Sequence, residues 1–395
     1  MDAVLIKKDV YWVGAIDWNL RDFHGYSTTL GGTYNAYLII DEKVTLIDNV
    51  YAPFAPEMIA RIKSVIDPSK IEVIISNHSE PDHSGSIHEI LKYAPNAKIY
   101  ASGPSGVRSM MGTYHDIEVL PVKTSDVVNI GKRDLQFVQT PLVHWPDNMV
   151  TYSPFDKILF SNDMLGQHIA SFERYDEQFE LPLLLVELRK YYANIVLPYG
   201  AQTQKALVAV KKLDIDLIAP SHGIIWKKYI KEALDLYEKM STYHKENKAV
   251  IIYDSMWGST EKMALEVGET FEKAGIKTLV RHVRKSPESD LIVDLMDAKY
   301  IAVGSPTLNN GIMPSIASFF CYMKGLNPRN LNFLVFGSFG WSGQGTDFAD
   351  KELEAMGYTR MMKPMRILYS PKEEQLETLK EAISEAIKAV QEKKI

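Results

Sequence analysis

The sequence predicts an α/β protein of two domains, on the basis of three observations. A chain of 395 residues is long enough for two or three domains. Beyond residue 247, apolar strand-like runs alternate with helical patterns, which is typical of a parallel sheet covered by helices on both faces. The earlier part has strand-like runs that end at histidines or carboxylates, and of the 10 histidines only His282 lies beyond residue 247. We therefore expect a first domain over residues 1–246, which carries metal chemistry, and a second over residues 247–395.

Composition and charge exclude several classes of function. The net charge is −6 with no basic stripe, so nucleic acid is not an expected partner. No apolar run approaches the ~20 residues that span a bilayer, and the N-terminus lacks a signal-peptide core, so we expect a cytoplasmic protein with no membrane association. The single cysteine, Cys321, cannot form an internal disulfide or supply the four thiolates of a cysteine-bound iron centre.

The elements of the first domain follow from hydrophobic periodicity and turn residues. The strand-like runs are interrupted by turn residues such as Gly31 and Gly32, and the first helix stops before Pro68. The expected strands are 10–16, 34–40, 43–48, 71–75, 97–101, 134–142, 157–161 and 217–220, and the expected helices are 55–66, 86–94, 105–112, 181–193, 202–213 and 229–240. The polar segment 241–249 is the expected linker.

The densest group of reactive side chains follows the apolar run 71–75. His78, Glu80, Asp82 and His83 lie within six residues, in a loop before a helix. The alternative interpretation is a polar turn in which Asp82 or Ser84 caps that helix. Two imidazoles and two carboxylates at alternating spacing favour a metal site instead, because nitrogen and oxygen donors crowd together at low cost only around a cation.

Three further candidates, His144, Asp163 and His222, each come just after an expected strand. Any one of them could be an ordinary turn residue. Strand ends converge at one rim of a sheet, so residues distant in sequence can meet there. Seven ligands are too many for one tetrahedral zinc ion. The pattern therefore predicts two metal ions that share a carboxylate.

The second domain has expected strands 249–253, 278–283, 300–303, 331–336 and 365–369, and expected helices 260–274, 288–296, 316–324, 346–356 and 372–393.

Three Gly/Ser-rich loops follow the strands of the second domain. The first opens a helix and suits a phosphate, two loops carry a tryptophan that can stack on a planar ring, and no Walker-type lysine is present. Ordinary strand-to-helix turns are the alternative, but together the loops predict a flavin mononucleotide (FMN) site. The candidate residues are Ser255, Met256, Trp257, Gly258, Ser259 and Thr260, then Pro306, Thr307, Leu308, Asn309 and Gly311, then Ser338, Phe339, Gly340, Trp341 and Gly343.

The motifs together resemble a known family. They are Asp17-Trp18-Asn19, His24-Gly25-Tyr26, the His78–His83 cluster, His144-Trp145-Pro146-Asp147, Ser161-Asn162-Asp163, Tyr191-Tyr192-Ala193-Asn194, Pro220-Ser221-His222-Gly223, Tyr253-Asp254-Ser255-Met256-Trp257 and the stretch 337–343. The whole chain resembles the flavodiiron proteins, or A-type flavoproteins, and within them the rubredoxin:oxygen oxidoreductases. The resemblance implies a metallo-β-lactamase-like αββα sandwich followed by a flavodoxin-like doubly wound parallel sheet. Zinc hydrolases with the first fold usually carry His-x-His-x-Asp-His, so Glu80 implies the di-iron branch.

The resemblance also implies roles for individual residues. One iron takes His78, Glu80 and His144, the other takes Asp82, His83 and His222, and Asp163 bridges them. Some members of the family turn the histidine at the position of His83 away from the metal. His24 and one of Tyr191 and Tyr192 are implied to line the substrate pocket.

The activity implied is reduction of O2 to water by electrons that pass from rubredoxin or a similar donor through FMN to the irons. Nitric oxide reduction to nitrous oxide and oxidation of reduced coenzyme F420 are alternatives within the family. The resemblance implies a head-to-tail homodimer, or a dimer of such dimers. Two rival classes are a zinc hydrolase, which has no use for a flavin, and an electron-transfer flavoprotein that has lost its metal, which the full ligand set disfavours.

Overall fold

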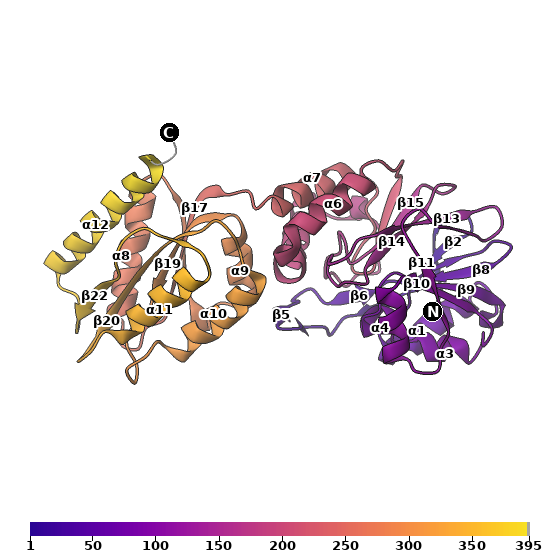
Figure 1. The fold of residues 1–395 in the computed structure, drawn as a ribbon, viewed down its shortest axis with the longest axis horizontal. Helices are drawn as coiled ribbons and strands as arrows, with labels where there is room; N and C mark the ends of the chain where they lie inside the picture. Colours follow the sequence, from indigo (N-terminus) through magenta and orange to yellow (C-terminus); the bar gives the residue numbers. More distant parts are fainter. Residues whose placement is uncertain (393–395) are drawn as a thin grey trace. The chain divides into compact units, whose positions relative to one another are not determined.

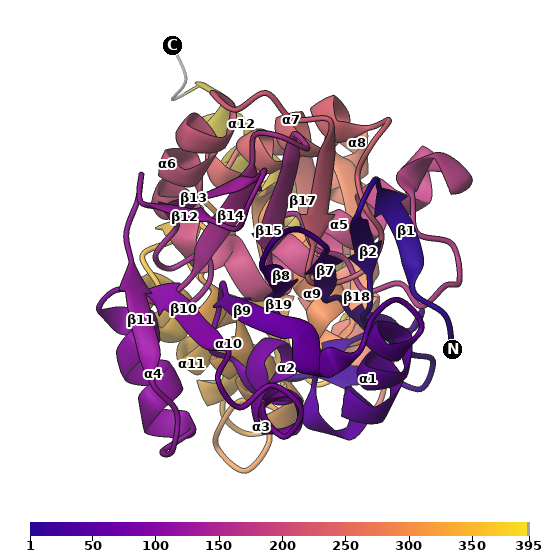
Figure 2. The same cartoon turned by 90° about the vertical axis from the view of Figure 1, so that its right-hand side faces the viewer.

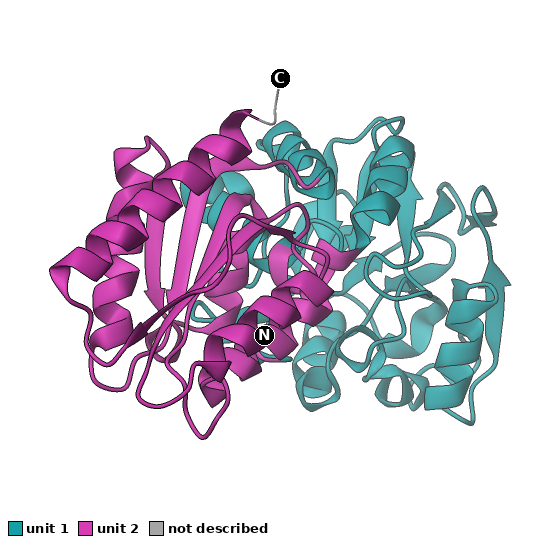
Figure 3. Cartoon of the chain, turned by 60° about the vertical axis from the view of Figure 1, so that its left-hand side comes forward, with its two compact units in different colours: residues 1–24, 28–192, 199–242 teal, residues 25–27, 193–198, 243–395 magenta. Residues whose placement is uncertain are grey.

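The computed structural model describes residues 1–392, which form two compact units (Figure 3). Unit 1 comprises Met1–His24, Thr28–Tyr192 and Tyr199–Thr242. Unit 2 comprises Gly25–Ser27, Ala193–Pro198 and the described chain from Tyr243 onward. Lys393, the last residue of the helix expected over 372–393, lies outside the described residues.

Unit 1 is built on two main sheets (Figure 1). The seven-stranded sheet has the order β1-β2-β7-β8-β9-β10-β11, and Figure 2 shows β8 to β11 side by side. Its strands are Val4–Lys7, Val10–Trp12, Tyr37–Ile39, Val44–Ile47, Ile71–Ser76, Lys98–Ser102 and Val119–Val122. The five-stranded sheet has the order β12 to β16, with strands Val127–Asn129, Asp134–Gln139, Met149–Ser153, Ile158–Asn162 and Leu217–Pro220. A small sheet pairs β3 (Ala15–Asp17) with β6 (Gly32–Tyr34), and the short strands β4 (Asp22–Phe23) and β5 (Tyr26–Ser27) lie between these two along the chain.

The strand-end side chains of unit 1 are held by a core between the two sheets. Val73 and Ile75 of β9 pack in one apolar cluster with Phe137 of β13 and Phe160 of β15. Ile74 of the same strand belongs to a second cluster, because successive side chains of a strand point to opposite faces. The expected buried strand over 71–75 is therefore confirmed, with both of its faces covered.

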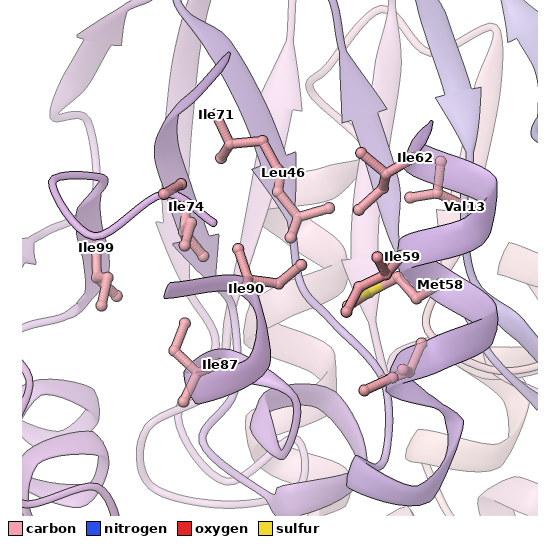
Figure 4. Close-up of a cluster of buried hydrophobic side chains, with 14 of the residues drawn as sticks. Val13, Leu46, Met58, Ile59, Ile62, Ile71, Ile74, Ile87, Ile90 and Ile99 are labelled. Carbon is pink, nitrogen blue, oxygen red and sulfur yellow. The ribbon is translucent and has the colours of Figure 1, made fainter. Parts of the chain in front are cut away.

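Helices cover the outer face of the seven-stranded sheet (Figure 4). Met58 and Ile62 of α1 (Ala55–Lys63) and Ile90 of α3 (Ile87–Leu91) pack against Leu46 and its neighbours. The spacing of four between Met58 and Ile62 places both side chains on one helical face. The remaining helices of this unit are α2 (Pro81–Ser84), α4 (Ser105–Thr113), α5 (Leu181–Tyr191), α6 (Gly200–Val210) and α7 (Ile230–Ser241). The unit is an αββα sandwich, as the resemblance implied.

Unit 2 is a parallel sheet with the order β18-β17-β19-β20-β21, and β22 also pairs with β20. This is the doubly wound order in which ligands bind where the chain reverses direction, here between β17 and β19. The strands β17 to β22 are Glu246–Tyr253, Lys277–His282, Ala298–Gly304, Asn332–Phe339, Thr359–Arg360 and Met365–Leu368. The helices α8 to α12 are Ser259–Lys273, Glu288–Met296, Pro314–Leu326, Gln344–Ala355 and Glu373–Glu392.

Several expected boundaries are wrong. The run 10–16 forms two strands, β2 and β3, which belong to different sheets. Between them, Gly14 lies so close to the backbone of Tyr34 that a Cβ there would clash. The expected linker 241–249 is shorter, since β17 begins at Glu246. In the third flavin loop, Ser338 and Phe339 belong to β20 rather than to a loop.

Candidate metal centre and flavin loops

The seven candidate metal ligands are placed by four strand ends of unit 1. The loop after β9 carries His78 and Glu80, and its continuation α2 carries Asp82 and His83. The segments after β13, β15 and β16 carry the other three, which are His144, Asp163 and His222. β9, β13, β15 and β16 belong to the two facing sheets, so their ends bring these side chains to one rim.

The structure gathers the seven side chains into two adjoining groups. His78, Glu80, His144 and Asp163 form the first group, and Asp82, His83 and His222 form the second, with the ligand atoms of each group within 4.8 Å of one another. In the first, His78 Nε2 and His144 Nε2 lie 3.2 and 3.3 Å from Glu80 Oε2. In the second, His83 Nε2 and His222 Nε2 lie 3.3 and 3.2 Å from Asp82 Oδ2. His83 thus points into the site.

Asp163 contacts histidines of both groups, and it does so through a different carboxylate oxygen in each case. Its Oδ2 lies 3.2 Å from His144 Nε2, and its Oδ1 lies 3.0 Å from His83 Nε2. The carboxylate is 1% exposed, and Ser221 Oγ and Tyr191 OH each donate to Oδ1 at 3.0 Å. A carboxylate held this way has the geometry to bridge two cations.

The donor atoms of this rim fit metal ions. Within residues 1–392, buried atoms without a hydrogen-bond partner include both oxygens of Asp82, Nε2 of His83 and His222, and Oδ2 of Asp163. Buried polar atoms are nearly always satisfied, and leaving one unsatisfied costs about 1–3 kcal/mol. Orphaned imidazole nitrogens and carboxylate oxygens that converge on one spot are satisfied together by a divalent cation.

Burial and neighbouring charges shift the pKa values of the site in opposite directions. Burial disfavours the charged forms of His78 and Asp163, yet hydrogen bonds to Asp147 and Glu80 raise the pKa of His78, and His83 and His144 lower the pKa of Asp163 well below its usual value. Burial also opposes protonation of His83, but Asp163 and Asp82 raise the pKa of His83 to about 9. The carboxylates thus draw positive charge strongly into a dry site, which favours cation binding.

Asp48, which the sequence analysis left without a role, connects three ligand-bearing loops. The buried carboxylate accepts from Asn77 N at 2.7 Å, Asn77 Nδ2 at 3.0 Å and Asn162 Nδ2 at 3.3 Å. Asn162 Oδ1 accepts from Asn148 Nδ2, and Asn148 Oδ1 accepts from Trp145 N. The residues next to His78, His144 and Asp163 therefore belong to one hydrogen-bonded network. Asp48 comes directly after β8, and this position after a strand is the one sequence signal that could have identified it.

His24 and Tyr191 both contact the cluster, and the ring of Tyr192 packs against another tyrosine. His24 Nε2 lies 2.9 Å from Glu80 Oε1, and this hydrogen bond raises the pKa of His24. Tyr191 ends α5, and a π-helical turn follows over Tyr192–Val196. The ring of Tyr192 packs on Tyr237, with centroids 4.9 Å apart. Of the two tyrosines, Tyr191 is the one that faces the candidate metals.

A pocket of about 320 Å³ leads to this rim. Its wall includes Leu20, Phe23, Tyr34 and Tyr51, beside His24 and Glu80. A mainly apolar pocket of this size suits a small uncharged molecule. The Phe23 ring also lies 5.0 Å from that of His168, a fully buried histidine that packs 4.8 Å from His222. The sequence analysis missed both residues, although His168 follows Asp163 by five positions.

In unit 2, the three candidate flavin loops follow the neighbouring strands β17, β19 and β20. The first loop opens α8, whose N-terminus offers backbone N–H groups to an anion. Ser255 Oγ accepts from Gly258 N at 3.0 Å, and Thr260 and Ser338 share a hydrogen bond of 2.9 Å between their hydroxyls. Thr307 N donates to Ser338 O at 3.1 Å, which ties the second loop to the end of β20.

The remaining candidates give these loops an open aromatic surface. Trp257 is 93% exposed and Trp341 is 80% exposed, and Met256 is also exposed. Two large indole rings left in water at the switch point of the sheet fit a planar aromatic cofactor, which would cover them. Leu308 and Gly311 form a tight bridged turn around Asn309. Gly258 and Gly340 have no atoms near a would-be Cβ, so neither is constrained by packing, while Gly258 has φ +85°, which favours glycine.

The comparisons with known proteins agree with the two-domain fold. A family model described as ODP family beta lactamase matches residues 33–223, and a flavodoxin model matches residues 251–383. Nitric oxide reductase of Moorella thermoacetica is 40% identical, over 91% of this chain and 92% of that protein. Rubredoxin oxygen:oxidoreductase from Desulfovibrio gigas has a TM-score of 0.96 at 38% identity, covering 99% of both chains. The flavodiiron protein from Giardia intestinalis has a TM-score of 0.94 at 32% identity, covering 99% of this chain and 97% of that one.

A β-lactamase-like domain whose rim gathers metal ligands, followed by a flavodoxin domain, defines a class of two-domain redox flavoproteins. This chain belongs to the flavodiiron proteins, and it is an oxidoreductase. The flavodoxin domain implies FMN as its cofactor, and the family carries a di-iron site. Within the described chain, no helix is both long and apolar enough to span a membrane.

Proposed function

We propose that the seven clustered side chains hold two iron ions and that the enzyme reduces O2 to water. One ion would take His78, Glu80 and His144, the other would take Asp82, His83 and His222, and Asp163 would bridge them. The observation that carries this proposal is Asp163 itself, whose two oxygens face different groups of ligands. Two metal positions with a shared carboxylate suit a reaction that needs several electrons at one place.

The iron pair, when bound, would supply reducing equivalents and Lewis acidity to the substrate. The protein supplies positioning and protons. The pocket, whose exposed lining is mainly apolar, would admit a small uncharged molecule to Glu80 and Asp82. His24 Nε2 orients Glu80 through its hydrogen bond, and the Tyr191 hydroxyl holds a proton 3.0 Å from Asp163 Oδ1. Both groups lie where a proton is needed when oxygen is reduced.

For FMN, we propose the three loops of unit 2 as the binding site. The backbone of Ser255–Thr260 at the start of α8 would hold the phosphate, and Trp257 and Trp341 would pack against the flavin ring. The second loop, from Pro306 to Gly311, would border the ring between them. The chain contains one cysteine, so the electrons must come from a separate donor, and rubredoxin is the donor we propose.

Nitric oxide is the second candidate substrate, because a relative that is 40% identical is named as a nitric oxide reductase. Oxidation of reduced coenzyme F420 is a further alternative for the donor side. We also propose a cytoplasmic head-to-tail homodimer, or a dimer of such dimers, in which the flavin of one subunit serves the irons of the other.

The decisive experiment uses one anaerobic sample of the holoenzyme reduced by rubredoxin. We expect O2 uptake, and N2O release when NO replaces O2, and the ratio of the two rates identifies the preferred substrate. Metal analysis of the same sample should give two irons per chain. Stoichiometric zinc with hydrolytic turnover would instead support the hydrolase alternative, and a reduced protein that consumed neither gas would support a pure electron carrier.

A further inference from the structure

The two metal positions differ in what lies behind their histidines. His78 Nδ1 lies 3.0 Å from Asp147 Oδ2, and the Asp147 carboxylate is 4% exposed. The same oxygen accepts from Ser79 N at 2.7 Å, and the backbone carbonyl of Asp147 accepts from Ser102 Oγ at 2.6 Å. Asp147 is therefore anchored by groups other than His78. Its carboxylate fixes the His78 proton on Nδ1 and leaves Nε2 free to face Glu80 and Asp163.

At the second position, no carboxylate hydrogen-bonds the Nδ1 atom of His83 or His222 within the described residues, although the buried Asp48 carboxylate interacts electrostatically with His83. His222 Nδ1 lies 2.8 Å from the backbone carbonyl oxygen of Thr33, which is neutral. His83 Nδ1 is buried and has no hydrogen-bond partner within the described part of the chain. A carboxylate thus accepts a hydrogen bond from His78 of the first position, whereas a neutral carbonyl accepts the one from His222 of the second.

A carboxylate behind a ligating imidazole has two effects on the metal. It makes the imidazole a stronger donor, because the shared proton moves negative charge onto the ring. It also adds a buried negative charge close to the ion, where the low dielectric weakens screening. Both effects favour the more highly charged state of the metal, and for iron that is the ferric state.

We propose that Asp147 is a positioning residue that makes the two iron positions unequal, so that the iron at His78, Glu80 and His144 is the more easily oxidised. The first electron to leave the fully reduced pair then comes from that position, and the second comes from the position at Asp82, His83 and His222. This inference rests on the proposed di-iron function. If it holds, the iron at His78, Glu80 and His144 would be the first of the two to pass an electron to the substrate.

The test is Asp147→Asn, which removes the charge and keeps the shape and an oxygen acceptor. We expect the holo variant to require a higher potential for its first oxidation, measured by an anaerobic redox titration followed by EPR and Mössbauer spectroscopy. A tenfold loss of ferric over ferrous preference corresponds to ~59 mV for a one-electron couple. We also expect a chelator to remove one of the two irons about 10- to 100-fold faster than from the wild type, since outer partners of metal-bound histidines commonly contribute that much affinity.

The matched control is Asp176→Asn. Asp176 is a fully buried carboxylate of the same unit that accepts from the backbone N–H groups of Lys227, Lys228 and Tyr229, and it contacts none of the seven ligands. This variant tests the loss of any buried charge, and its potentials should match those of the wild type. Asp147→Glu, which keeps the charge, should recover part of the shift.

The outcomes separate the two proposals. If the wild type does not hold two irons, the proposed function fails and this inference fails with it. If two irons are present but Asp147→Asn leaves both potentials unchanged, shifts both equally, or behaves like Asp176→Asn, only the inequality is overturned. A variant that unfolds can be recognised by its circular dichroism, and Asp147→Glu then gives the deciding potential.

Discussion

The metal rim of unit 1 and the flavin loops of unit 2 both lie at the ends of strands, but they are prepared for their ligands in opposite ways. The candidate metal ligands are mostly buried side chains, and hydrogen bonds from Asp48 and from Asp147 hold the loops that carry them. The flavin loops instead present backbone groups and exposed tryptophans. The difference follows from the ligands. A small cation needs charged donors in fixed positions, whereas a large planar cofactor can bury apolar surface of its own when it binds.

The largest effect is expected when the shared ligand is removed. Asp163→Ala should weaken iron binding by far more than the ~10–100-fold that is typical when a hydrogen-bond partner of a metal ligand is lost. O2 and NO turnover should fall to background. The flavin absorbance spectrum should be unchanged, because the substituted side chain lies in the other unit. Iron analysis and gas uptake on one preparation measure both quantities. Retained oxidase turnover would mean that Asp163 is not a ligand.

The flavin site should show the reverse pattern. Trp257→Ala and Trp341→Ala should each weaken FMN binding by about 1–3 kcal/mol, the usual cost of losing an aromatic stacking partner. Iron content should stay at the wild-type value. Titration of the apo-flavin protein with FMN measures the affinity, and Trp257→Phe is the matched variant that keeps a ring. An alanine variant with unchanged affinity would remove that tryptophan from the site.

Tyrosine variants test the hydrogen bond to Asp163. Tyr191→Phe should lower turnover by about 10-fold or more, because a hydrogen bond to a charged group contributes about 1.5 kcal/mol or more. Tyr192→Phe should change turnover by less than about twofold, since its ring packs on Tyr237 rather than on the cluster. Steady-state rates of the two variants, each with two irons bound, give the comparison. Equal losses would show that the hydroxyl at Asp163 has no part in the reaction.

The smallest expected effect concerns Lys245 in unit 2, whose positive charge is opposed by burial. Burial lowers the pKa of Lys245 to about 7, and its Nζ donates to Met296 O at 2.9 Å. The unfolded chain keeps the proton up to its ordinary, higher pKa, so the unfolded state binds more protons above pH 7 and stability should rise with pH. Between pH 7 and 8 the gain should approach ~1 kcal/mol.

Lys245→Met is the matching variant for that slope. Denaturant unfolding of the apo-protein at pH 7 and pH 8 should show the rise in the wild type and a flatter response in the variant. If the two proteins respond equally, Lys245 is charged in the folded state throughout this range.

The sequence was sufficient to predict that the seven side chains meet at one rim, but not which residues support them. The seven donors follow strands, and strand ends of facing sheets meet, so local pattern was enough to expect them in one place. Thr33 and Asp48 act through a backbone carbonyl and through asparagines far away in the chain, and no local pattern reports such contacts. The choice between Tyr191 and Tyr192 depended on how α5 passes into a π-helical turn, which periodicity does not reveal. The strand β14 was missed, although all five of its residues are buried, because a short apolar stretch gives little periodic signal.

The tryptophans of the chain offer a practical way to follow the binding of the flavin. Trp12 and Trp226 are buried in unit 1 and should emit at short wavelength, whereas Trp257 and Trp341 lie in water and should emit at long wavelength. A flavin ring that covers the exposed pair would quench the red side of the emission and leave the blue side nearly unchanged. The intrinsic fluorescence spectrum should therefore report FMN occupancy directly, without a label and without waiting for turnover.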